Sequence, residues 1–166
     1  MNRSDNQRAV FLEKITDFIL DNGLAVSSLR VLAKAADTSD RMLLYYFKDK
    51  AELMHGVMAA LEQRLSSVLD DIIFAEPVVF DALVDPVRDI LMGDDVHPYM
   101  LLRLEVACLA SRGDDFFMQT RDNFAEVLLS WIKRQLNSRT AIARDSEAKK
   151  LLSYVDGHLM QNMAVT

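Results

Sequence analysis

The segment SLRVLAKAADTSDRMLLYYFKDKAEL, which spans residues 28–53, decides how this chain folds. Apolar residues recur at spacings of three and four between Leu29 and Ala36, which places them on one face of a helix. Ser28 stands just before this helix, where a side-chain oxygen can cap free backbone N–H groups. The tripeptide DTS that follows Ala36 favours a turn over a continued helix.

A second, short helix is expected after Ser39, which can cap it. Leu43 and Phe47 lie four residues apart and can turn together into a core. Asp49 and Glu52 have the spacing of a capping box and predict the start of a long helix. A helix, a tight turn and a second short helix form the layout of a helix-turn-helix, whose second helix enters the major groove of DNA.

Ten positions of this segment form a recognisable pattern: Leu32, Ala33, Ala36, Ser39, Leu43, Tyr46, Phe47, Lys50, Glu52 and Leu53. Together they resemble the N-terminal signature of the TetR family of bacterial transcriptional regulators. The chain departs from the family at Asp37-Thr38, where the family usually has Gly-Val, and at Leu44, where it usually has Tyr. The resemblance implies an all-α fold of about eight helices. A three-helix helix-turn-helix domain is expected at residues 1–48, and a helical ligand-binding and dimerisation domain at residues 49–166.

The resemblance also implies which side chains contact DNA. Positions that usually contact backbone phosphates hold Ser28, Tyr46 and Lys50. Positions that usually reach base edges hold Arg30, Asp40 and Arg41. The chemistry agrees, because Arg can read O6 and N7 of guanine and Asp can accept from N4 of cytosine. The full set of predicted DNA-binding residues is Ser28, Arg30, Ser39, Asp40, Arg41, Leu44, Tyr45, Tyr46 and Lys50. The alternative is that the charges are ordinary solvated groups and the tyrosines are core residues.

The charge of the chain is not that of a typical nucleic-acid binder. Its net charge is −6, from 19 Lys and Arg against 25 Asp and Glu. Residues 1–54 hold eight residues of each sign, so the acidic excess lies entirely after them. The candidate DNA-binding part is neutral overall, and its cations have to gather on one side to bind phosphate.

Apolar spacing predicts the remaining helices. The first is expected at residues 6–22, and a helix of about 25 residues is expected to run from Lys50 to a point before Pro77. Later helices are expected at residues 78–92, 99–111, 116–136 and 146–165, with a break near Pro86 and a polar link at residues 137–145.

Residues 154–161, YVDGHLMQ, are similar to the last dimer helix of the TetR family, which implies a homodimer. The residues predicted for this dimer interface are Leu128, Ile132, Leu152, Val155, Gly157, Leu159 and Met163. A small-molecule effector is also implied. The side chains predicted to bind it are Phe74, Tyr99, Arg103, Phe117, Phe124 and Trp131. Arg103 has two alternatives, which are a ligand carboxylate or a salt bridge to another side chain.

Cysteine usage and the termini suggest a cytoplasmic protein. Cys108 is the single cysteine, so no internal disulfide can form, and its apolar neighbours suggest a buried, unreactive thiol. No Cys/His cluster suggests a metal, and no cofactor is expected. The polar N-terminus does not look like a signal peptide, and no apolar run is long enough to span a bilayer.

The sequence carries no catalytic motif, and its three histidines, His55, His97 and His158, lie in separate segments. The favoured interpretation is therefore a dimeric DNA-binding transcriptional regulator, a repressor relieved by a small molecule, that binds a double-stranded DNA operator. One rival is a helical ligand-binding or scaffold protein that has lost operator binding. A second rival, an enzyme built on a helical bundle, finds no supporting pair of His or carboxylate residues.

Overall fold

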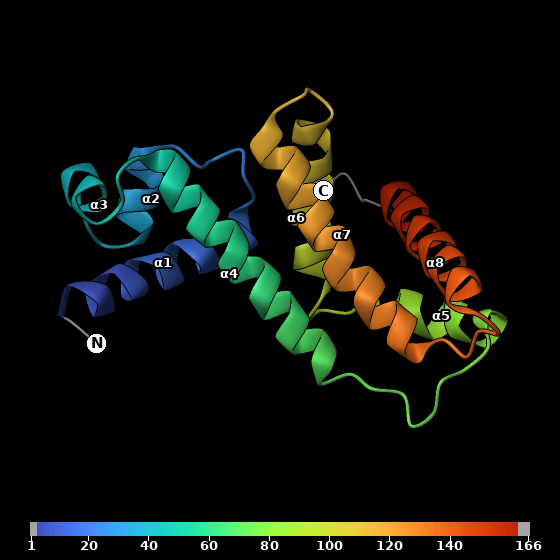
Figure 1. The fold of residues 1–166 in the computed structure, drawn as a ribbon. Coiled ribbons are helices and arrows are strands. Elements are labelled where there is room, and N and C mark those ends of the chain that lie inside the picture. Colours follow the sequence, from blue (N-terminus) through green and yellow to red (C-terminus); the bar gives the residue numbers. More distant parts are fainter. Residues whose placement is uncertain (1–2, 163–166) are drawn as a thin grey trace.

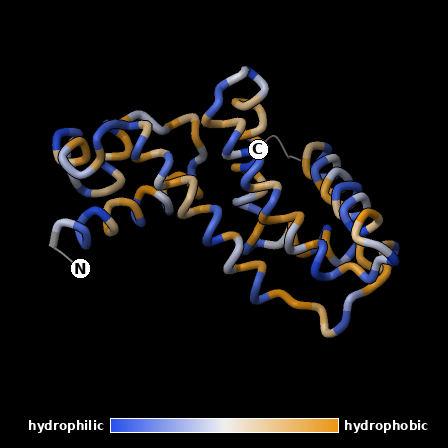
Figure 2. Tube along the Cα trace, in the orientation of Figure 1, coloured by the Kyte–Doolittle hydropathy of each residue, from blue (hydrophilic) through white to orange (hydrophobic). Residues whose placement is uncertain are grey.

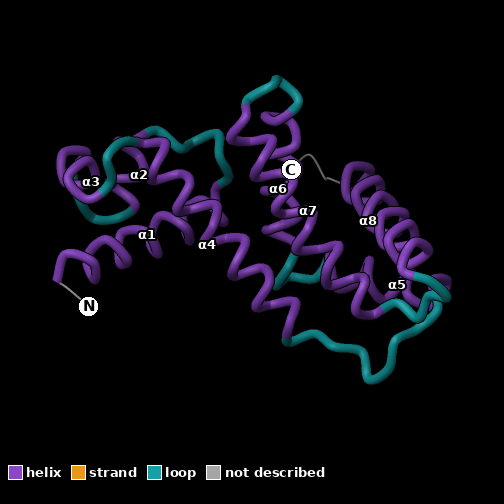
Figure 3. Tube along the Cα trace, viewed as in Figure 1, coloured by secondary structure: helices purple, strands orange, loops and turns teal. Residues whose placement is uncertain are grey.

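The protein is described by a computed structural model, which covers residues 3–162 and contains eight α-helices (Figure 1). They are α1 (Arg3–Asn22), α2 (Leu29–Ala35), α3 (Asp40–Tyr46), α4 (Lys50–Asp70), α5 (Phe80–Leu91), α6 (His97–Ala110), α7 (Asp115–Gln135) and α8 (Ala141–Asn162). Over these residues there is no strand (Figure 3). One isolated backbone bridge pairs Val78 with Leu136. The prediction of an all-α fold with about eight helices is confirmed.

Helices α1, α2 and α3 gather at one end of the molecule, and α5 and α8 lie at the other (Figure 1). The long helix α4 connects the two ends, because it packs against α1 and also against α7. Apolar and polar residues alternate along the helices (Figure 2), and each helix contributes buried apolar side chains to the core.

The turn between α2 and α3 forms although it lacks the glycine that is usual there. Asp37 has a φ of 53°, in the left-handed region. The N–H of Thr38 donates to the carbonyl of Ala33 at 2.9 Å, and the N–H of Asp37 donates to the carbonyl of Lys34 at 3.1 Å. These two bonds define a Schellman motif. Asp is one of the few residues whose short polar side chain tolerates this conformation.

Three predicted helix starts are confirmed by their caps. Ser28 and Ser39 each accept a hydrogen bond from the backbone N–H three residues further on. At the start of α4, Asp49 accepts from the N–H of Glu52, and the Glu52 carboxylate accepts from the N–H of Lys48, both at 2.8 Å. The chain therefore enters α4 in a fixed direction, immediately after the helix-turn-helix.

A small core holds the first three helices together. Ile15 and Ile19 of α1, Leu32 of α2, Leu43 of α3 and Phe47 are all 0–1% exposed. Because Leu43 is the only fully buried residue of α3, the rest of that helix is available to the outside.

Helix α4 is shorter than expected, since it ends at Asp70 after 21 residues. The loop at residues 71–79 is fixed to α7 instead of continuing the helix. The indole N–H of Trp131 donates to the carbonyl of Ile72 at 2.9 Å, and the Gln135 side chain accepts from the N–H of Phe74 at 3.2 Å.

Two other expectations are corrected. Pro86 lies inside a continuous α5 and does not break it. It removes one backbone donor, but Leu83, Val87 and Leu91 bury one face of the helix on both sides of it. Helix α8 begins at Ala141 rather than at residue 146, because Thr140 caps it by accepting from the N–H of Ala143 at 3.1 Å. Of the helices that are described, none is long and apolar enough to cross a membrane.

Candidate nucleic-acid interface

The outward surface of α2 and α3 carries most of the residues predicted to contact DNA. Those that are exposed are Ser28, Arg30, Ser39, Asp40, Arg41, Leu44, Tyr45 and Lys50. Tyr45 is 75% exposed and Leu44 45%, so neither belongs to the core. Tyr46 is half-buried. The structure thus places eight of the nine predicted residues in the unit formed by α1, α2 and α3, and Lys50 follows directly as the first residue of α4.

Ser28 and Ser39 both cap helices, and this role is compatible with a phosphate contact. Each hydroxyl oxygen accepts from a backbone N–H, of Val31 at 3.4 Å and of Met42 at 3.3 Å. A hydroxyl has one hydrogen to donate as well as lone pairs to accept with. Both residues can therefore cap a helix and still donate to a phosphate oxygen.

Two basic residues of α1 form ion pairs within the chain. Arg8 pairs with Glu52 at 2.9 Å and donates to the carbonyl of Tyr46, and its guanidinium carbon lies 4.6 Å from the centre of the Phe47 ring. Lys14 pairs with Asp37 at 2.7 Å. The N–H of Lys48, followed by the Arg8 guanidinium, holds the pKa of Glu52 below its usual value.

Five other cations are free to attract phosphate. Within the described part of the chain, no ion pair is formed by Arg30, Lys34, Arg41, Lys48 or Lys50. Over the same stretch Asp37 is paired with Lys14, and Asp49 caps α4. Residues 1–54 are therefore neutral overall, but side chains on and near α3 carry an excess of positive charge that is not paired with carboxylates.

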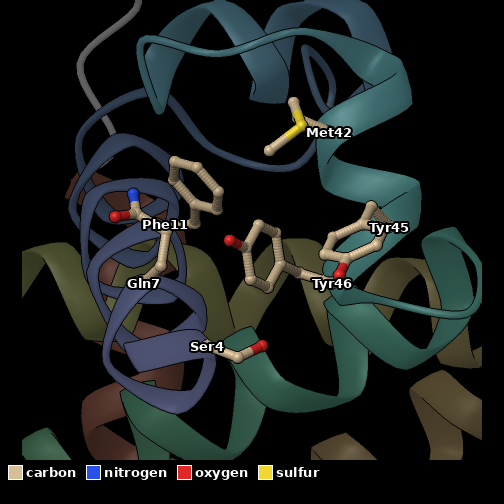
Figure 4. Close-up of a pocket in the computed structure, with 6 residues that line it drawn as sticks. All are labelled: Ser4, Gln7, Phe11, Met42, Tyr45 and Tyr46. Atoms are coloured by element: carbon tan, nitrogen blue, oxygen red, sulfur yellow. The ribbon is translucent and has the colours of Figure 1, made fainter. Parts of the chain in front are cut away.

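A cavity of about 390 Å³ lies between the start of α1 and α3 (Figure 4). Its lining residues are Ser4, Gln7, Phe11, Met42, Tyr45 and Tyr46. The Tyr46 ring meets Phe11 edge-on, with ring centres 5.4 Å apart, and meets Tyr45 edge-on at 5.1 Å. Figure 4 shows the Tyr46 hydroxyl pointing toward α1.

Ser4 and Gln7 were not predicted as functional residues. Their hydroxyl and amide groups can contact a phosphate or sugar without adding charge. A signal was present in the sequence, since Gln7 lies four residues before Phe11 and so shares its helical face. Only the packing of α1 on α3 shows that this face borders the candidate interface.

The residues predicted to bind an effector have different surroundings in the structure. Phe124 and Trp131 are fully buried core residues, and Phe74 lies in the loop that is fixed to α7. Tyr99 borders a surface cavity beside Arg64, and burial raises the pKa of its hydroxyl. Phe117 is half-buried in the first turn of α7.

The structure shows which partner Arg103 has. Both of its terminal nitrogens donate to the carboxylate of Asp156 on α8. Its partner is therefore another side chain of the same chain, and the pair joins α6 to α8.

The structure places most of the predicted dimer residues inside one chain. Leu128, Ile132, Val155 and Leu159 are fully buried and Leu152 is 5% exposed, because α7 and α8 pack on each other within one chain. Gly157 lies on the open face of α8, where an added Cβ would meet no atom within 4 Å. Met163 lies outside the described residues. Cys108 was expected to be buried, but its position on α6 is exposed.

In this chain an exposed helix-turn-helix is joined through one long helix to a helical bundle. This arrangement defines a class of all-helical proteins, and the chain has a TetR-like fold. No family model matches the sequence, and no curated protein does. The fold is similar to SCO7518 of Streptomyces coelicolor A3(2), with a TM-score of 0.68 at 18% identity over 96% of this chain and 88% of that one. Salmonella enterica GusR gives a TM-score of 0.64 at 16% identity, over 96% and 84%. The multidrug binding protein EbrR in complex with proflavin gives 0.64 at 20% identity, over 93% and 87%.

Proposed function

We propose that this protein is a DNA-binding transcriptional regulator that reads a duplex operator as a homodimer. The observation that carries the proposal is the exposure of α3. All of its residues except Leu43 and the half-buried Tyr46 are exposed, and five cations on or near it, Arg41 included, form no ion pair within residues 3–162. A short helix of this kind, supported by a three-helix core, suits insertion into a major groove.

The roles follow from the chemistry of each side chain. Arg30, Asp40 and Arg41 supply donors and an acceptor for base edges. We assign Lys50 and the hydroxyl of Ser28 to phosphate contacts, which position the protein on DNA without reading its sequence. Ser39 and Tyr46 add hydroxyl groups for the same purpose. Tyr45, exposed beside Leu44, offers the phenol that the usual tyrosine would provide at the neighbouring position.

We further propose that residues 1–48 act as the DNA-binding domain and residues 49–166 as the effector and dimerisation domain. The boundary coincides with the N-cap of α4, although α4 packs on α1 across it. For the second copy we favour the outward face of α8, where Tyr154 is 46% exposed and Gly157 leaves open space. Because a bacterial regulator of this kind acts on DNA, we propose that the protein is located in the cytoplasm.

The proposed regulation is repression relieved by a small molecule. Two recognition helices read one operator only when they are spaced by about one turn of DNA, roughly 34 Å. A ligand that binds another arrangement more tightly shifts the population away from that spacing. EbrR is a multidrug binding protein of the same fold, which supports this scheme.

A screen against promoter fragments tests the proposal. The protein is incubated with fragments of its own genome at low and moderate salt, and retained fragments are sequenced. We expect a small set that shares a palindromic site. Retention of no fragment by the folded protein, or of all fragments equally, would contradict the proposal.

One rival has a specific observation in its favour. On α3, Leu44 exposes an apolar side chain and Asp40 a carboxylate, and neither attracts phosphate. These two residues favour a helical ligand-binding protein that has lost operator binding. It would bind no fragment at either salt concentration, which separates it from the regulator.

A further inference from the structure

An apolar groove of about 630 Å³ lies where the link between α1 and α2 meets α6. The residues that define it here are Leu24 of the link, Leu101, Leu104, Glu105 and Cys108 of α6, and Met160 of α8. Most of these side chains are apolar, and Met160 is 67% exposed. The volume lies within the range of about 300–1,000 Å³ that holds drug-sized ligands.

Glu105 is the one charged side chain in the lining. One carboxylate oxygen accepts from the backbone N–H of Leu24 at 2.7 Å. The other oxygen would overlap a Cβ on residue 23, so the carboxylate can approach the chain closely because residue 23 is a glycine. Over residues 3–162, Glu105 forms no ion pair with Lys, Arg or His.

The carboxylate is therefore partly buried among apolar groups with one hydrogen bond and no opposite charge. A carboxylate offers about four acceptor positions, and one N–H uses one of them. In surroundings of low polarity, a missing counter-charge is costly, and a cation brought by a ligand restores it.

We propose that this groove binds a lipophilic cation, with one positive charge facing Glu105 and an apolar body between Leu24 and α6. This class of ligand matches both properties of the site. An anion would be repelled by Glu105, and a neutral apolar molecule would leave the carboxylate without a counter-charge.

The position of the groove gives the ligand a regulatory role. Leu24 belongs to the link that leads into α2 of the helix-turn-helix, whereas α6 belongs to the bundle and is joined to α8 by Arg103 and Asp156. A ligand held between them contacts both parts and favours one relative placement. This role rests on the proposed function, whereas the binding site itself does not.

Cys108 provides a reporter for the site. It is the single cysteine of the chain, it is exposed, and it lies in the groove. The rate of its alkylation by N-ethylmaleimide is measured with no addition, with tetraphenylphosphonium and with tetraphenylborate. These two ions have the same shape and opposite charge. We expect tetraphenylphosphonium to slow alkylation at least fivefold and tetraphenylborate to leave it unchanged.

Two variants test the residues, and a third is the control. Glu105→Gln keeps an oxygen for the Leu24 N–H and removes the charge, so the Kd for tetraphenylphosphonium is expected to rise at least tenfold. Leu101→Trp fills the groove without altering Glu105 and is expected to abolish protection of Cys108. Glu76→Gln, in the loop before α5, removes a charge elsewhere and is expected to leave the Kd unchanged. Circular dichroism checks the fold of each variant.

Several results would overturn the inference. These are equal protection by both ions, no protection by the cation, or unchanged cation binding in folded Glu105→Gln. If that variant does not fold, unchanged protection in Leu101→Trp overturns it. Protection that grows with protein concentration alone would instead assign the groove to a second copy of the chain. None of these assays contains DNA, so failure to bind an operator leaves their outcome unaffected.

Discussion

The guanidinium of Arg103 on α6 donates from both terminal nitrogens to the carboxylate of Asp156 on α8. The two side chains are 12% and 27% exposed, which makes this the most buried ion pair among the described residues. Among residues 3–162 the Nε of Arg103 has no hydrogen-bond partner, so there the pair is held by its two terminal contacts alone.

Replacing Arg103 by Met should leave the half-buried Asp156 carboxylate without a partner. We expect a loss of about 1–3 kcal/mol in the free energy of unfolding, because an unpaired charge costs more than the pair contributes. Urea denaturation measures it. The double variant Arg103→Met with Asp156→Leu should recover part of the loss. Arg121→Met, which breaks an exposed pair with Asp122, should change stability by less than about 0.5 kcal/mol.

Asp37→Gly should stabilise the protein. Residue 37 has a positive φ, which glycine adopts at no steric cost and Asp does not. The lost pair with Lys14 involves exposed side chains and contributes little. We expect the Tm to rise by about 2–4 °C. Asp37→Ala loses the same ion pair and does not adopt a positive φ more easily than Asp, so it should lower the Tm. A rise in the Tm of both variants would refute this explanation.

Glu62→Gln should stabilise the protein in a manner that depends on pH. Burial raises the pKa of Glu62 above 4.5, and the hydrogen bond from Asn123 opposes this only in part. A raised folded pKa means that ionisation is penalised in the folded state. The contribution of Glu62 to the stability of the wild type is thus present below pH 4.5 and is lost as pH rises through the folded pKa. The variant should melt about 2 °C higher at pH 7 and equal the wild type below pH 4.5, as scanning calorimetry can show.

Asp145→Asn should have the opposite pH dependence. Lys133 of α7 and Lys149 of α8 donate to this carboxylate at 2.8 and 2.7 Å and lower its pKa from 3.8 to about 2. A lowered folded pKa gives stability that is present above pH 3.8 and lost as pH falls through about 2. The variant should melt below the wild type at pH 7, by about 2 °C, and the two should converge near pH 2. A constant difference across the range would show that the charge is not responsible.

On a bound operator, two kinds of basic residue should behave differently. Arg41→Ala should reduce the preference for the cognate site over a scrambled one by about 1–3 kcal/mol. Lys50→Ala should weaken binding to both sites alike and reduce the slope of log K against log salt by about one. Fluorescence anisotropy at several salt concentrations measures both quantities. Arg139→Ala, an exposed arginine in the link before α8, is the matched control and should change neither.

Local features of the fold could be predicted from the order of the residues alone. The caps at Ser28, Ser39 and Asp49 and the positions of α2 and α3 could be predicted, because they depend on residues within one or two helical turns. Asp37 was recognised as a departure from the family pattern, but only the structure shows that it adopts the left-handed conformation of the missing glycine.

The tertiary structure alone decided which apolar faces meet. Leu128 and Val155 were expected on a dimer surface and instead pack inside one chain, whereas Cys108 was expected inside and lies in an open groove. A helical repeat shows that a face is apolar but not what covers it. Covering depends on how segments distant in sequence pack, and so does the pairing of Arg103 with Asp156, 53 residues away.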